Sequence, residues 1–176
     1  TTSGINVWYL STALFHRSAW GRKLIVVLLC DLESSGPESS MAITIKTKEE
    51  IETLREGGKL LSLVLARVAA AVAPGVSTFE LDALAERLIV ESGGTPSFKG
   101  YRMADIRTPY PATLCVSIND EVVHATPRKD KILHEGDVVS LDVGIWWKKL
   151  CTDMAITVGV GKVSGEVERM MAATKE

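Results

Sequence analysis

The chain lacks a strong excess of charge of either sign. Its 176 residues include 20 lysines and arginines against 22 aspartates and glutamates, and aromatic residues make up only 6% of them. No basic stripe interleaved with aromatic residues is present, although such a stripe is the usual sign of a nucleic-acid-binding surface. We therefore expect no nucleic-acid partner.

Cysteine is scarce, and the N-terminal apolar run is too short to cross a bilayer. The three cysteines, Cys30, Cys115 and Cys151, are odd in number and lack the spacing of a metal knuckle. Reduced thiols in a cytosolic protein are the expected state. The run from Leu24 to Cys30 is far shorter than the ~20 residues that span a membrane, so no membrane partner is expected.

Residues 1–40 differ in character from the rest of the chain. They contain no acidic residue before Asp31, and Ser34 to Ser40 has the composition of a linker. A secretory signal would need a longer apolar stretch and a small-residue cleavage site, whereas an organellar transit peptide agrees with the early lack of acids. We favour Met41 as the true start, with 1–40 an atypical extension that is disordered or non-native. Residues 41–176 then form one domain, since 46% hydrophobic content suffices for a core.

Two amphipathic helices are predicted at the start of this domain. Capping boxes begin at Thr47 and at Ser77, each with a glutamate three residues later that reaches back to the cap. Proline and glycine at 74–75 end the first helix, and two glycines from Gly93 end the second. Their apolar stripes are interpreted as core: Ile51, Leu54, Leu61, Leu65, Val68 and Val72 in the first, and Leu81, Leu84 and Leu88 in the second.

The stretch from Val139 to Val158 predicts a β-hairpin that carries two aspartates. Alternation places Asp142 and Asp153 on the small, polar side of their strands, away from the apolar side. A turn centred between Trp147 and Lys148 would set the two aspartates directly across from each other, with Cβ atoms ~5 Å apart. Like charges at this distance repel, and a divalent cation held between them is the simplest compensation. Solvated carboxylates on an exposed sheet face are the alternative.

A second hairpin is predicted upstream. Leu114 to Ile118 alternates like a strand, Asn119-Asp120 reverses the chain, and a returning strand from Val122 brings His124 to the same sheet. A lone histidine on a strand is commonly structural. Beside a paired-aspartate metal site, however, its imidazole can donate a hydrogen bond to a substrate or transfer a proton.

These segments together resemble the N-terminal half of a type I methionine aminopeptidase. The resemblance rests on SINDEVVHATP, EGDVVSLDVG and TDMAITVGVG, and it extends upstream through the loop from Phe98 to Tyr101, covering about Met41 to Glu176. It implies an α+β fold, the N-terminal half of a pita-bread fold, with two helices packed on antiparallel hairpins. It also implies that residues 41–176 are a truncated catalytic domain.

The resemblance implies roles for seven residues. Asp142 and Asp153 would bind two neighbouring divalent metal ions, and His124 would hydrogen-bond the substrate at the scissile amide. Four residues match the pocket for the methionine side chain: Phe98, Tyr101, Tyr110 and Cys115. An extra stretch, 102–109, separates the two tyrosines and could shift the rim of that pocket. Core packing is the alternative role for Phe98 and Tyr110.

The family's remaining ligands, a histidine and two glutamates, lie in the second half of its fold. Glu166 and Glu168 are better explained as first-turn acids of a helix, so this chain is expected to lack part of the active site and to be inactive alone. The metals could be Co, Mn, Fe or Zn, because oxygen ligands do not identify them. In its full-length form the enzyme would remove the N-terminal methionine of nascent polypeptides by metal-assisted amide hydrolysis.

Further expectations follow from the same resemblance. The partners would be nascent peptide N-termini, with the ribosome as a second candidate, and the full-length form would be a cytoplasmic monomer, or organellar if 1–40 is a transit peptide. Two other functions stay open. One is another aminopeptidase or prolidase of the same fold, and the other is a non-catalytic binding relative.

Overall fold

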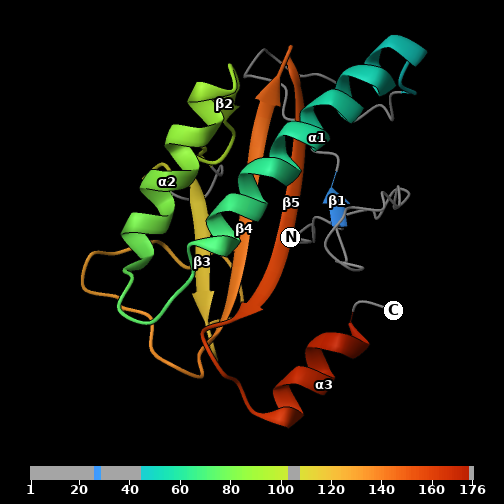
Figure 1. Cartoon of the computed structure of the whole chain (residues 1–176). Helices are drawn as coiled ribbons and strands as arrows, with labels where there is room; N and C mark the ends of the chain where they lie inside the picture. The colour runs from blue at the N-terminus through green and yellow to red at the C-terminus, as the bar shows by residue number, and fades with distance from the viewer. Residues whose placement is uncertain (1–25, 29–44, 103–107, 175–176) are drawn as a thin grey trace, which may run out of the picture.

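The computed structural model describes residues 26–28, 45–102 and 108–174. Along the chain the elements are β1 (Val26–Leu28), α1 (Lys48–Ala70), α2 (Thr78–Glu91), β2 (Thr95–Pro96), β3 (Leu114–Ile118), β4 (Val138–Trp147), β5 (Leu150–Gly159) and α3 (Gly165–Ala173) (Figure 1).

Both predicted capping boxes are confirmed. The Glu50 amide donates to Thr47 Oγ1 at 3.2 Å, while the Thr47 amide donates to Glu50 Oε2 at 2.7 Å. Ser77 makes the same reciprocal pair with its glutamate at the start of α2. Because each box satisfies two amides that a helix cannot bond internally, it fixes where the helix begins.

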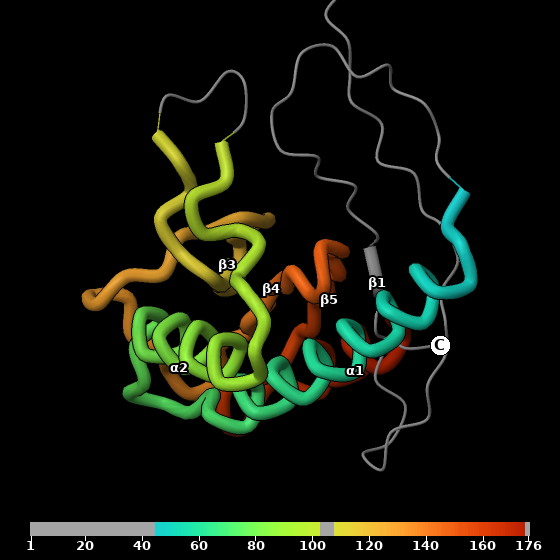
Figure 2. The backbone as a smooth tube through the Cα atoms, turned by 90° about the horizontal axis from the view of Figure 1, so that it is seen from above, coloured from blue at the N-terminus to red at the C-terminus, as the bar shows by residue number. Residues whose placement is uncertain are grey.

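The helices cover one face of an antiparallel sheet. The strand order is β1-β5-β4-β2, and β3 also pairs with β4. Figure 2 shows α1 and α2 together on one side of β3, β4 and β5. Side chains from both layers bury the core, including Leu61, Val68, Leu81, Ile89, Leu114, Val116, Leu141, Val143 and Ile145. The α+β prediction is confirmed, and the opposite face of the sheet is left for other groups.

The predicted register of the β4–β5 hairpin is wrong. Its turn is formed by Lys148 and Lys149, whose φ angles are 46° and 72°, so that Asp142 faces Ala155 and Asp153 faces Gly144. A two-residue turn that follows the twist of its strands needs positive φ at both central residues, and two lysines adopt it here although neither type signals such a turn. The two aspartates still share a face, but as diagonal neighbours.

The second predicted hairpin is only partly formed. The chain folds back along β3, and the Val116 amide donates to the Ala125 carbonyl at 3.0 Å, but the returning segment is not a strand. Val122 and Val123 are 87% and 64% exposed, so no apolar face holds them in a ladder. His124, with φ of 58°, also departs from the extended conformation that a strand requires.

The two ends of the chain add one strand and one helix. β1 lies within the predicted extension and pairs with β5, while the other residues before 45 lie outside the described ranges, as does Cys30. The boundary at residue 41 therefore stays a prediction. α3 has Ser164 as its N-cap. Among the helices that the structure describes, none is long and apolar enough to cross a membrane.

Candidate active site

The face of the sheet away from the helices carries both aspartates in two neighbouring rows. In one row Cys115 on β3 faces Asp142 on β4, which faces Ala155 on β5. In the next row Gly144 faces Asp153. Adjacent strands lie about 4.8 Å apart and alternate residues share a face, so the two carboxylates meet across a diagonal of this small patch.

Burial dominates the electrostatics of the aspartate pair. Loss of solvent raises the pKa of Asp142. It raises the pKa of Asp153 to about 8, with the neighbouring Asp142 charge as a further cause. The free pair therefore resists losing both protons at neutral pH, and a bound cation would remove this penalty.

The donor chemistry of the pair fits a divalent cation. Asp153 Oδ1 is buried and has no hydrogen-bond partner within the described part of the chain, although buried carboxylate oxygens normally have one. Hard cations take such oxygens as ligands. The pair gives only part of a coordination sphere, because the described ranges contain no group of three metal-ligating side chains.

His124 lies at the exposed rim of this patch. Its charge lowers the pKa of Asp142, which places it within electrostatic reach of the pair. The backbone at His124 is left-handed, a conformation that non-glycine residues adopt mainly where the surroundings impose it. The structure therefore brings together the three residues that the sequence singled out most strongly.

Tyr110 and Cys115 form the side of the patch next to β3. The Tyr110 hydroxyl lies 3.1 Å from the Leu114 carbonyl and 3.4 Å from that of Ala125. Burial raises the pKa of Cys115 to about 12 and that of Tyr110 above its ordinary value, so both stay neutral. Tyr110 thereby ties the residue after His124 to the start of β3.

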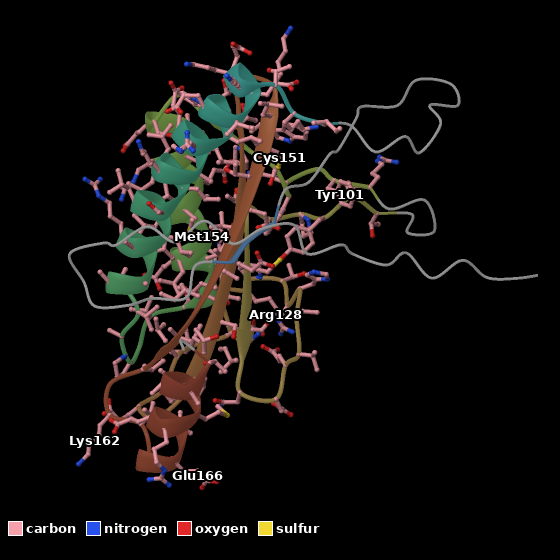
Figure 3. All side chains as sticks on the ribbon, turned by 90° about the vertical axis from the view of Figure 1, so that its right-hand side faces the viewer. Tyr101, Arg128, Cys151, Met154, Lys162 and Glu166 are labelled. Carbon is pink, nitrogen blue, oxygen red and sulfur yellow. The ribbon has the colours of Figure 1, made fainter. Side chains whose placement is uncertain are left out.

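Phe98 lies against the patch, while Tyr101 lies at its edge. Phe98 Cε1 is 3.0 Å from the position that a Cβ on Gly144 would take. Tyr101 is 41% exposed and stands on the side of the sheet away from α1 and α2 (Figure 3). The Tyr110 amide donates to the Tyr101 carbonyl at 2.8 Å. The extra stretch 102–109 is therefore closed at its base, and its residues 103–107 lie outside the described ranges.

Comparison with known proteins identifies the family. The model of metallopeptidase family M24 matches residues 52–176. The chain belongs to this family. A methionine aminopeptidase of Aquifex aeolicus is 46% identical over 138 residues, which cover 77% of this chain and 53% of that protein. Methionine aminopeptidase 1 of Mycobacterium tuberculosis is 42% identical over 127 residues, covering 72% of this chain and 46% of the relative.

Solved structures agree with this M24 assignment. A methionine aminopeptidase from Thermotoga maritima superposes with a TM-score of 0.70 at 34% identity, covering 76% of this chain and 51% of that one. An Xaa-Pro dipeptidase from Bacillus anthracis gives 0.58 at 25% identity, covering 71% and 32%. The fold is that of one half of a pita-bread enzyme, and the chain spans about half the length of the curated relatives it matches.

Sequence reasoning missed two residues that lie near Cys115 and Gly144 of this patch. Asp82, buried on α2, accepts the amides of Thr113 and Leu114 at 2.8 and 2.9 Å and so anchors the strand that carries Cys115. An aspartate next to Leu81 on an apolar helix face was a usable signal. Ser97, which continues β2 beside Gly144, gave none, because it is a lone serine in a short connection.

Proposed function

We propose that this chain supplies the aspartate-bearing part of an aminopeptidase that removes N-terminal methionine. The observation that carries the proposal is the placement of Asp142 and Asp153, both partly buried, on one face of the sheet, with an unsatisfied oxygen on Asp153. The relatives named methionine aminopeptidases, at 42 to 46% identity, support this reaction over others of the M24 family.

In this proposal the two carboxylates hold two divalent metal ions, of which Co, Mn, Fe and Zn are candidates. Bound there, such ions would supply Lewis-acid chemistry for amide hydrolysis. Asp142 and Asp153 would fix the position of the metal ions. Because the two carboxylates are partly buried, neutralising their charge makes ion binding favourable. His124, at the rim, donates a hydrogen bond at the scissile amide.

The methionine side chain is assigned to the apolar surface beside the pair. Phe98 supplies a ring against the sheet, and Cys115 a buried, neutral thiol that gives polarizable contact to a thioether. Tyr110 holds this wall in place through its bonds to main-chain carbonyls. Tyr101, half exposed at the edge, is placed where the substrate enters.

The site needs further ligands, which we assign to a second lobe. In this chain alone, two carboxylates would leave most coordination positions of the divalent ions to water. A histidine and two glutamates, expected from the methionine aminopeptidase resemblance, would complete the set. The substrate would be the N-terminus of a nascent peptide, bound at or near the ribosome. The full-length enzyme would be a cytoplasmic monomer.

A chimeric enzyme tests the proposed reaction. Residues 41–176 would be joined to the remaining half of the Aquifex aeolicus relative and assayed with Mn²⁺ on the peptide Met-Ala-Ser. We expect release of methionine, reduced by roughly 10²-fold or more by Asp142→Asn, since loss of groups that only support a metal ligand already costs 10–100-fold. Ser140→Ala, on the same face but bonded to Thr157, should retain activity. Cleavage only of Xaa-Pro bonds, or none that depends on Mn²⁺, contradicts the proposal.

A further inference from the structure

Ser97 stands in the same row of the sheet face as Asp153. Its amide donates to the Gly144 carbonyl at 3.1 Å, and Gly144 in turn faces Asp153. Ser97, Gly144 and Asp153 therefore lie side by side on three successive strands or strand extensions. The middle position has no side chain, and Ser97 Oγ and Phe98 Cε1 lie over it instead.

The Ser97 hydroxyl lies over Gly144, on the face of the sheet that carries Asp153. A Cβ built on Gly144 would overlap Ser97 Oγ, so the hydroxyl occupies the space that any other residue at 144 would fill. Facing residues on paired strands have Cβ atoms about 4.5–5.5 Å apart. Because Ser97 Oγ occupies the Cβ position of Gly144, it is a neighbour of Asp153 in this row, and one water can bridge such a spacing.

Two polar atoms of this row lack a hydrogen-bond partner in the described part of the chain. Ser97 is 6% exposed, and its Oγ and Asp153 Oδ1 are buried atoms with no hydrogen bond to any described residue. A hydroxyl can donate, whereas an ionised carboxylate can only accept. Since an unsatisfied buried polar group lowers stability, one water that bonds both atoms is favoured.

We propose that Ser97 is a positioning residue for Asp153. Its hydroxyl donates a hydrogen bond to one water, which in turn donates to the free carboxylate oxygen, and this link holds the carboxylate in the orientation that cation binding needs. This rests on the proposed function, because it assigns Asp153 as a metal ligand. Partners that orient a ligand in this way typically contribute 10–100-fold to metal affinity.

Mn²⁺ affinity of the full 176-residue chain, measured by calorimetry, tests the proposal. Ser97→Ala should weaken binding about 10- to 100-fold, and Asp153→Asn should abolish it. Thr152→Val is the matched control: Thr152 Oγ1 is another buried hydroxyl without a partner, but it points to the helix side of the sheet, near Gly57. This control should bind Mn²⁺ like the wild type.

The outcomes separate the two claims. If Asp153→Asn abolishes binding while Ser97→Ala binds like the wild type, the role of Ser97 is overturned and the metal site stands. If Asp153→Asn leaves binding unchanged, or the wild type binds no Mn²⁺, the proposed metal site fails. In that case a crystal structure decides on Ser97: a link from its Oγ to the Asp153 carboxylate through one water supports the contact, and a bond to any other acceptor overturns it.

Discussion

At the scale of single residues, the aspartate pair makes the metal-free protein sensitive to pH. The pKa of Asp153 is raised to about 8 in the folded chain, by burial first and by Asp142 second, against about 4 in an unfolded chain. The folded state therefore holds a proton that the unfolded state has released. This contribution to the free energy of unfolding is complete below pH 4 and is lost as pH rises toward 8.

We expect the metal-free chain to lose a few kcal/mol of unfolding free energy between pH 5 and pH 8, measured by urea titration with a chelator present. Asp153→Asn should remove most of this loss, because the amide does not titrate. Glu166→Gln, an exposed change on α3, should leave it in place. A slope that survives in Asp153→Asn would mean that the pair is not the titrating group.

Asp82 offers a test of the anchor that holds β3. Asp82→Ala leaves the amides of Thr113 and Leu114 without their acceptor, and we expect a loss of about 2–4 kcal/mol in urea unfolding. Asp82→Asn keeps an acceptor oxygen and removes a charge whose burial raises the pKa of Asp82. It should cost less than about 1 kcal/mol. Equal losses in the two variants would contradict the anchoring role.

At the scale of elements, glycines in α1 distinguish packing from helix propensity. A Cβ on Gly57 would lie 3.2 Å from Trp147 Cβ, whereas one on Gly58 would meet nothing within 4 Å. Gly58→Ala should therefore raise the free energy of unfolding by about 0.5–1 kcal/mol through helix propensity alone. Gly57→Ala should gain less or lose stability, because α1 must move off the hairpin. Thermal melts of the two variants compare them directly, and equal gains would contradict the close contact.

The β4–β5 turn carries strain that glycine can relieve. Lys149 has a φ of 72°, a left-handed conformation that costs most residues about 1–2 kcal/mol. We expect Lys149→Gly to stabilise the chain by about 1 kcal/mol in urea unfolding, while Lys149→Ala, which keeps a Cβ, should not. Lys148 is left unchanged because its Nζ bonds Glu56 at 2.7 Å. Stabilisation by alanine as great as by glycine would refute this explanation.

The same turn shows how far sequence reasoning reached. The helix starts followed from local chemistry, since a capping box is complete within four residues. The alternation of β4 and β5 also gave the correct face for each aspartate. Register depended instead on the turn residues, and Lys148 and Lys149 resemble no preferred turn. No sequence pattern indicated Ser97, because its proposed role arises only from a row of residues that three separate segments bring together.

At the scale of the whole molecule, the layers explain why the site is on one face. α1 and α2 bury the apolar side of the sheet (Figure 2), so small and acidic residues collect on the other side. Burial of Asp142 and Asp153 on that side is unfavourable for their ionised forms and lowers the free energy of unfolding of the metal-free chain. A ligand that neutralises the pair must return this free energy as stability, which links metal binding to folding.

We therefore expect Mn²⁺ to raise the melting temperature of the whole chain. At a free concentration tenfold above the dissociation constant the gain is about 1.4 kcal/mol, or roughly 3–6 °C for a protein of this size. The shift should be larger at pH 8 than at pH 6, because at the lower pH the cation must displace a proton from the pair. The double variant Asp142→Asn, Asp153→Asn should melt at the same temperature with and without Mn²⁺. A shift in melting temperature that persists in the double variant would show that Mn²⁺ binds elsewhere. Metal binding would then not relieve the unfavourable burial of Asp142 and Asp153.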